Sequence, residues 1–361
     1  MAGNRKYQKW LLIVLLAALA GGGGLLFGRL IRERIRRTSG VPLDDRRREE
    51  LREKLDYNPR SIFIYDPRIS YRLKPDFRGV RHDSPGHLHL TNSRGLLGGE
   101  EVNPDPAVRK VLFLGDSVAY GSHVPYDEIF IARMAGEAGD GYQFLNASCP
   151  GWSTHQELGF YRDHLSDLPI DQVVIVFTIN DLLLFEWVWR DEQSFQMSAE
   201  LRGLGGLTNS RLTDLALRNL RNQFWESPRL RPLAELNNTC LTAYLDRSWS
   251  RFRREVEPAL RKLAEERKVI LAPAPARPQL ESLNLGGGPE TVLFPQRRLE
   301  ELAREVGIGY LDLLPAFRGE NGDYDVDLFL PGEPGVLHLS GEGHRRLAEW
   351  LRPGLLEKMQ P

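Results

Sequence analysis

Between residues 109 and 313, short apolar segments alternate with longer amphipathic ones, and this alternation limits the folds open to the chain. Five segments are predicted to be strands: 111–114, 142–146, 172–177, 269–273 and 309–313. The segment 172–177 is continuous in apolar and β-branched residues, as expected of a strand buried on both faces. Strands and helices that alternate imply a parallel sheet covered by helices. We therefore predict an α/β fold, a three-layer α/β/α sandwich with a mostly parallel sheet.

Helices are predicted between and after these strands. They cover residues 126–137, 154–165, 248–267, 295–306 and 341–358. A segment at about 182–247, which contains tryptophans and arginines, interrupts the alternation and is predicted to be a mostly helical insertion. The main domain with this insertion spans residues 109–361.

The first 56 residues are typical of a membrane anchor followed by a stalk. Residues 10–27 carry no charge, which is close to the minimum length for spanning a bilayer, although the glycines at 21–24 weaken the helix. We predict a transmembrane signal anchor within residues 1–30 and a charged helical stalk over residues 31–56. The string Ala18-Leu-Ala20 also fits a signal-peptidase site, so cleavage is an alternative.

Residues 57–108 contain short β-like segments separated by turn formers, for example 61–65 and 71–75. This pattern predicts a β-rich extension packed against the main domain. His87 and His89 would point to one face of a strand. Because no third ligand is evident, we interpret them as surface or packing residues and not as metal ligands.

Composition excludes several classes of protein. The net charge of −1 and the 27% charged residues show no basic excess, so we expect no nucleic-acid partner. Cys149 and Cys240 are too few for a disulfide scaffold and are expected to be free buried thiols. No paired cysteines and no HExxH motif are present, and we expect neither a metal nor an organic cofactor.

The strand at 111–114 stops at Gly115 and is followed by Asp116 and Ser117. Open α/β sheets place their ligands at this end of a strand. A serine there can be a nucleophile if a base takes its proton and if hydrogen-bond donors stabilise the oxyanion that forms. Ser117 is therefore the candidate nucleophile.

Three later segments can supply the other groups. Gly151 follows the second strand, where its backbone N–H can approach a ligand; a role in the turn alone is the alternative. Asn180 follows the third strand and can donate its side-chain amide, whereas an N-cap role for Asn180 or Asp181 is the alternative. His338 lies in a loop that can return to the sheet edge, while His344 falls inside the last helix and is expected to be structural.

Together these segments resemble the conserved blocks of the SGNH, or GDSL-like, hydrolase superfamily, over roughly residues 110–351. The resemblance implies a flavodoxin-like sheet and a catalytic role for each segment. Ser117 would be the nucleophile and His338 the base. The N–H groups of Ser117 and Gly151 and the side-chain amide of Asn180 would be the oxyanion donors. The extension is similar to the region that precedes this domain in membrane-anchored bacterial members.

The chain departs from the family pattern at two positions. Thr178 replaces the glycine of the third block, which leaves the Asn180 donor in place. The family usually has an aspartate three residues before the catalytic histidine, and here Gly335 occupies that position before His338. The same loop contains three carboxylates that can replace it, namely Glu333, Asp325 and Asp327. Alternatively, a backbone carbonyl orients His338 in a Ser–His dyad.

These features predict a membrane-anchored esterase that cleaves or transfers an acyl group, with an envelope glycan or lipid ester as substrate. A carbohydrate O-acyltransferase is one alternative, and a catalytically silent envelope binding or assembly protein is another. Five arginines at 29–37 follow the apolar segment and three basic residues precede it, so charge counting favours a cytoplasmic domain. The family resemblance suggests envelope substrates, and we expect an extracytoplasmic domain, either periplasmic or at the cell surface.

Overall fold

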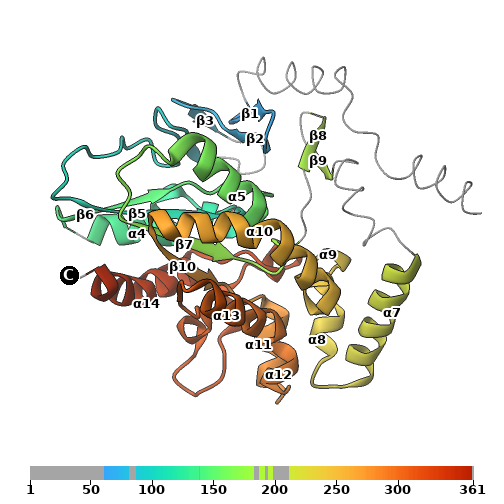
Figure 1. The fold of residues 1–361 in the computed structure, drawn as a ribbon. Coiled ribbons are helices and arrows are strands. Elements are labelled where there is room, and N and C mark those ends of the chain that lie inside the picture. Colours follow the sequence, from blue (N-terminus) through green and yellow to red (C-terminus); the bar gives the residue numbers. More distant parts are fainter. Residues whose placement is uncertain are drawn as a thin grey trace, which may run out of the picture.

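A five-stranded parallel sheet forms the centre of the protein, as the computed structural model shows (Figure 1). The structure describes residues 61–80, 87–137, 139–182, 187–191, 194–197 and 211–359. The sheet contains β5 (Arg109–Gly115), β6 (Tyr142–Asn146), β7 (Gln172–Phe177), β10 (Lys268–Pro273) and β11 (Gly309–Tyr310).

The strands lie in the order β11-β10-β7-β5-β6, and each neighbouring pair is parallel. From β5 the chain moves to one side to form β6 and then crosses to the other side of β5 to form β7. This is the flavodoxin order, and its switch point lies between β5 and β7. All six residues of β7 are buried, which explains its continuous run of apolar side chains.

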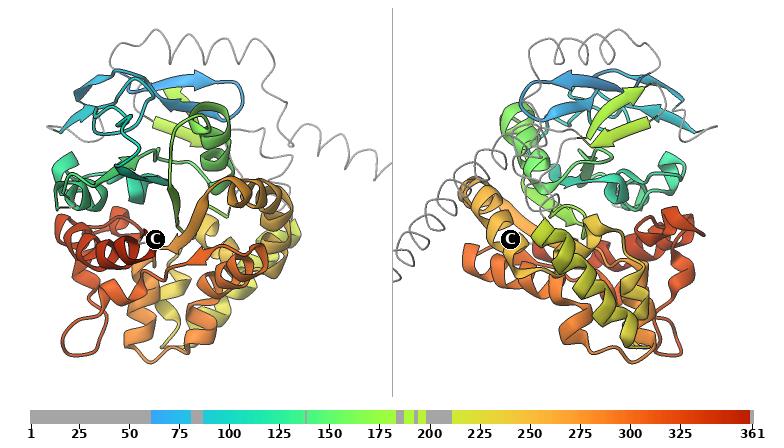
Figure 2. Two further views of the ribbon diagram at one scale, coloured as in Figure 1. Left: turned by 60° about the vertical axis from the view of Figure 1, so that its left-hand side comes forward. Right: turned by 90° about the vertical axis from the view of Figure 1, so that its right-hand side faces the viewer.

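Helices cover both faces of this sheet (Figure 2). On one face α4 (Phe130–Glu137) contacts α14 (Gly341–Met359). On the other face α10 (Asp246–Glu266) contacts both α5 (Thr154–Phe160) and α13 (Phe294–Val306). The predicted α/β fold, with a parallel sheet between two helical layers, is confirmed.

Shorter elements fill the connections. The short helices are α3 (Ser117–Tyr120), α8 (Arg231–Ala234), α9 (Asn238–Leu241), α11 (Arg277–Asn284) and α12 (Pro289–Val292), and the longer α7 (Arg211–Glu226) precedes α8. Single turns of 3-10 helix are η1 (Tyr126–Glu128), η3 (Thr242–Tyr244), η4 (Leu314–Phe317), η5 (Val326–Leu328) and η6 (Glu333–Val336), and η2 (Tyr161–Leu165) is a π-helical turn.

The extension consists of two antiparallel hairpins. One pairs β1 (Phe63–Asp66) with β2 (Ser70–Leu73), and the other pairs β3 (Arg78–Val80) with β4 (Leu88–Leu90). The β1–β2 hairpin, blue in Figure 1, lies beside α5, where Gln156 donates a hydrogen bond to the Ile69 carbonyl. Leu97, which follows the second hairpin, forms a β-bridge with Asn146 at the end of the edge strand β6. Tyr71 of the extension is fully buried and makes hydrogen bonds with Pro150 and Trp152, so the extension packs against the main domain.

Two expectations differ from the structure. The insertion is not helical at its start, because β8 (Trp187–Asp191) pairs there with β9 (Ser194–Met197). The sequence Trp-Val-Trp in β8 consists of residues that favour strands. The last strand is also shorter than predicted, since Asp312 accepts a hydrogen bond from the Leu314 N–H (2.9 Å) and turns the chain into η4.

The predicted anchor (1–30) and stalk (31–56) lie outside the described residues. Within the described part of the chain, no helix combines the length and the apolar character needed to cross a bilayer.

Candidate active site

Three of the predicted site segments follow neighbouring strands at one edge of the sheet. Ser117 begins α3 directly after β5, and Asp116 caps this helix by accepting a hydrogen bond from the Val118 N–H (2.9 Å). Gly151 lies in the loop after β6, and Asn180 follows β7. Because parallel strands end at the same edge, the sheet order itself gathers these segments at the switch point.

The fourth segment reaches the same place from the far end of the chain. Nε2 of His338 lies 2.8 Å from Oγ of Ser117. The loop that carries His338 is held by its backbone, since the His338 carbonyl accepts a hydrogen bond from the Leu330 N–H (3.0 Å). The structure therefore brings together the two residues that the sequence pairs as nucleophile and base.

His344, the other histidine of this segment, is structural as predicted. Its ring is buried and stacks on Phe130. Burial lowers its pKa to about 3, assisted by the positive charge of Arg133. A neutral ring at this depth suits packing between α14 and α4.

Gly151 occupies a turn that only a glycine accommodates without strain. Its φ of 78° lies in the left-handed region. The turn is closed by a hydrogen bond from the Trp152 N–H to the Cys149 carbonyl (3.2 Å), and the Cys149 N–H donates to the Gly115 carbonyl (3.1 Å). The loop is thus tied to the end of β5, next to Ser117.

The side chain of Asn180 is held by its neighbours below the sheet edge. Its amide Nδ2 donates to Oδ2 of Asp116 (3.0 Å). The Thr178 hydroxyl lies within hydrogen-bond distance of Asp116, Asn180 and Asp181. An amide carries two hydrogens, so Asn180 retains one N–H for a ligand. Thr178 stands where the family pattern has a glycine, and its hydroxyl lies in the middle of this hydrogen-bond network.

A fully buried carboxyl group lies beside this network, and the sequence did not indicate its role. Glu157 on α5 is completely buried, and neither of its carboxyl oxygens has a hydrogen-bond partner among the described residues. Burial raises its pKa well above the usual range, and the negative charge of Asp116 raises it further. One signal was available in the sequence, because position 157 falls on the apolar face of the helix predicted over 154–165.

The carboxyl group of Asp181 is also buried and has a raised pKa, like that of Glu157. Its carboxyl group is buried, and its Oδ2 accepts a hydrogen bond from the Thr178 N–H (2.8 Å). Burial, followed by the charges of Asp116 and Glu157, raises the pKa of Asp181 well above its usual range. At neutral pH we therefore expect Glu157 and Asp181 to be protonated, because three neighbouring carboxylates would repel one another in a low-dielectric interior.

The position of Gly335 explains why no side chain is present three residues before His338. A Cβ atom built on Gly335 would lie 1.5 Å from the Leu330 carbonyl oxygen, so this backbone conformation excludes every other residue. The ring of His123 packs against His338 instead, with 5.0 Å between ring centroids. The loop is therefore shaped around a glycine and does not merely lack an aspartate.

Three carboxylates were predicted as possible replacements for the family aspartate, and they lie in different surroundings. Asp325 caps η5 by accepting a hydrogen bond from the Asp327 N–H (3.0 Å), and Asp327 is exposed. The side chain of Glu333 lies outside the described part of the chain. A supporting role for any of them stays a prediction.

Both cysteines are free and buried, as predicted. Burial raises the pKa of the Cys240 thiol to about 12, with further contributions from Asp116 and Asp181. His89 is buried and packs against Tyr120, in agreement with a packing role. Within the described residues, no group of three or more His, Cys, Asp or Glu side chains is arranged to hold a metal ion.

The buried carboxyl groups make stability depend on pH. A carboxyl whose pKa is raised in the folded protein contributes stability below its unfolded pKa and loses it as pH rises through the folded pKa. We expect the free energy of unfolding to fall as pH rises above about 5, by up to about 1.4 kcal/mol per pH unit for each group that stays protonated. In Glu157→Gln this fall should be smaller, because the amide never ionises.

Urea unfolding of both proteins at several pH values measures this difference. Glu226→Gln, at an exposed glutamate, is the matched control and should follow the native protein. An identical pH dependence for Glu157→Gln and the native protein would show that Glu157 is not protonated in the fold.

Comparison with solved structures finds proteins of low sequence identity. The chain is similar to a lipase/acylhydrolase from Enterococcus faecalis, with 17% identity, 70% of this chain and 98% of that chain covered, and a TM-score of 0.41. For a carbohydrate acetylesterase from Sinorhizobium meliloti the identity is 17%, the coverage 70% and 100%, and the TM-score 0.37. For the inhibitor-bound aryl esterase of M. smegmatis these values are 13%, 69% and 99%, and 0.38.

Comparison of the sequence with protein families is decisive. No curated relative matches the chain. The sequence model of the GDSL-like Lipase/Acylhydrolase family matches residues 113–346, a range that includes Ser117, Gly151, Asn180 and His338. Since this match covers more than half of the chain, the protein belongs to the GDSL-like lipase/acylhydrolase family.

Proposed function

We propose that this protein hydrolyses a carboxylic ester and that Ser117 and His338 perform the reaction. The observation that carries the proposal is the 2.8 Å contact between Oγ of Ser117 and Nε2 of His338. A base within hydrogen-bond distance of a hydroxyl can take its proton as the oxygen attacks a carbonyl carbon. Membership of an acylhydrolase family agrees with this chemistry.

In the proposed mechanism, Oγ of Ser117 attacks the ester carbonyl while Nε2 of His338 accepts the hydroxyl proton. The tetrahedral intermediate collapses, and His338 returns the proton to the departing alcohol. A water molecule, activated by the same histidine, then hydrolyses the acyl enzyme. Transfer to an acceptor hydroxyl in place of water would make the protein an acyltransferase.

The negative oxygen of the intermediate needs donors that are fixed before the reaction begins. We assign this role to the N–H groups of Ser117 and Gly151 and to the remaining amide hydrogen of Asn180. Two contacts support the assignment: the Asn180 amide is oriented by Asp116, and the Gly151 loop is tied to β5. No acceptor among the described residues is paired with the Gly151 N–H, so this donor is available.

For the substrate we propose an ester of an envelope glycan or lipid. The basis is the uncharged segment 10–27, which would hold the domain at a membrane. We propose that the domain lies on the extracytoplasmic side, where such esters occur.

Removal of the nucleophile or of the base should abolish turnover. Relative to the full-length native protein, we expect Ser117→Ala and His338→Ala each to lower kcat for p-nitrophenyl acetate by about 10⁴-fold, with the fold preserved. Ser166→Ala, at an exposed serine that hydrogen-bonds a helix carbonyl, is the control and should keep full activity. A folded native protein without activity, and without labelling by a serine-directed phosphonate, would contradict the proposal and favour a silent binding protein.

Asn180→Ala should lower kcat by about 100- to 1000-fold, because one preorganised oxyanion donor is lost. The matched control is Asn237→Ala, which removes an N-cap side chain from α9 and should affect only thermal stability. If Asn180→Ala lowers the melting temperature but leaves kcat unchanged, Asn180 is a structural cap and not part of the mechanism.

The location can be tested by fusing a reporter to the C-terminus. Alkaline phosphatase, which is active only after export, should be active in this fusion. Green fluorescent protein, which fluoresces in the cytoplasm, should not. The opposite pattern would mean that the basic cluster at 29–37 keeps the domain inside the cell.

A further inference from the structure

The N-terminal extension contacts the two segments that carry the proposed nucleophile and oxyanion donor. On the nucleophile side, Nδ1 of His89 lies 2.8 Å from the hydroxyl of Tyr120, which belongs to the same short helix as Ser117. On the oxyanion side, Tyr71 and Ile69 make hydrogen bonds with the loop and helix that follow β6. The extension is therefore close enough to influence the geometry of the site.

Tyr71 contacts the peptide group that carries the proposed oxyanion donor at Gly151. Its hydroxyl donates to the Pro150 carbonyl at 2.8 Å, and both groups are buried. The Pro150 carbonyl and the Gly151 N–H belong to one planar peptide, in which the two bonds point in opposite directions. Holding the carbonyl oxygen at one side therefore fixes the direction of the Gly151 N–H at the other.

The Pro150–Gly151 peptide is also the one whose rotation would interconvert two types of turn. Pro150 and Gly151 are the central residues of the turn closed by Trp152 and Cys149, and the φ of 78° at Gly151 corresponds to a type II turn. Types I and II differ by a rotation of the central peptide through about 180°. In the type I form the Gly151 N–H would point away from its present direction, and the hydrogen bond from Tyr71 opposes that rotation.

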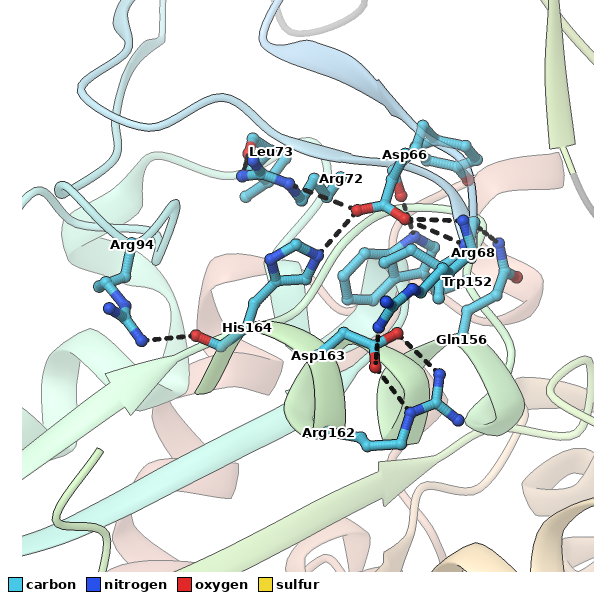
Figure 3. Close-up of polar contacts among 12 residues, drawn as sticks. Asp66, Arg68, Arg72, Leu73, Arg94, Trp152, Gln156, Arg162, Asp163 and His164 are labelled. Atoms are coloured by element: carbon cyan, nitrogen blue, oxygen red, sulfur yellow. Dashed lines mark hydrogen bonds and ion pairs between the residues drawn. The ribbon is translucent and has the colours of Figure 1, made fainter. Parts of the chain in front are cut away.

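Further hydrogen bonds hold Tyr71 itself in register with the loop. Nε1 of Trp152 donates to the Tyr71 carbonyl (3.0 Å), and Nε2 of Gln156 donates to the Ile69 carbonyl (2.9 Å). Figure 3 shows Trp152 and Gln156 pointing from the domain toward the segment that follows Asp66. Each donor is buried, so water does not compete for these bonds.

Hydrogen bonds of the Asp66 carboxyl group fix the start of this segment. Oδ2 of Asp66 lies 2.7 Å from Nε2 of His164 on η2, and Oδ1 accepts hydrogen bonds from the N–H groups of Arg68 (2.9 Å) and Ile69 (3.2 Å) (Figure 3). Asp66 thus shapes the turn between β1 and β2 while it joins that turn to the domain.

We propose that Tyr71 is a positioning residue for the oxyanion donor at Gly151, and that the extension is in this way a functional part of the catalytic domain. The inference rests on the proposed esterase function for its kinetic consequence, but not for its structural one. Tyr71 holds the Pro150–Gly151 peptide in the orientation that presents its N–H. It also polarises the peptide, because a hydrogen bond to the carbonyl strengthens the N–H as a donor.

The test compares two tyrosines in the full-length protein. Tyr71→Phe removes only the hydroxyl that binds Pro150. Tyr244→Phe is the matched control, since Tyr244 is also buried and its hydroxyl donates to the Val292 carbonyl (3.0 Å), which belongs to none of the four site segments. Both variants should lose similar, small amounts of thermal stability.

Two readouts separate positioning from packing. Amide hydrogen exchange at Cys149 and Trp152 should accelerate about tenfold in Tyr71→Phe and remain native in Tyr244→Phe, because one hydrogen bond no longer holds the turn. In Tyr71→Phe, kcat for p-nitrophenyl acetate should fall by about tenfold or more with KM unchanged, since the donor acts on the transition state.

Native exchange in the turn of Tyr71→Phe would overturn the inference, whether or not the protein is an esterase. Faster exchange with unchanged kcat in an active enzyme would also overturn it. Faster exchange in a protein with no esterase activity would support the structural part of the inference and show that the proposed function has failed.

Discussion

The parallel pairing of β5 with both β6 and β7 is the constraint on which the site depends. Phe113 on β5 pairs with Asn146 on β6 and with Val174 on β7, so the three strands end close together. The segments that follow these strands leave the sheet from one edge, at the switch point of the topology. The buried strands below make that edge rigid, and short loops can therefore place donors and a nucleophile accurately.

Several polar side chains are buried next to this edge of the sheet. The Asp116 carboxylate accepts hydrogen bonds from Val118, Thr178 and Asn180. Burial, followed by the charge of Asp116, raises the pKa values of the Glu157 and Asp181 carboxyl groups. A single negative charge with several donors is far less costly to bury than three, which explains how such a cluster can lie under the sheet edge.

The site is completed by parts of the chain that would not be stable alone. The loop of His338 relies on a backbone hydrogen bond to Leu330 and on the absence of a side chain at Gly335. Two-stranded hairpins such as β1–β2 are marginal in isolation, and this hairpin is fixed by Asp66, Tyr71 and their partners in the domain. Docking of the extension and the geometry of the Gly151 turn are therefore linked.

The sequence by itself determined the α/β class and most strand and helix positions, because these follow from local periodicity. The pairing of Ser117 with His338 came from the resemblance of their segments to the motif blocks of the family. The sequence did not predict the hairpin β8–β9 or the short β11, where pairing partners and a side-chain cap decide the local conformation. Only the tertiary structure revealed the buried carboxyl group of Glu157, the hydroxyl of Thr178 among three side chains, and the contact between Tyr71 and Pro150, which lie 79 positions apart. These features depend on distances and burial between segments remote in sequence, and such quantities exist only after the chain has folded.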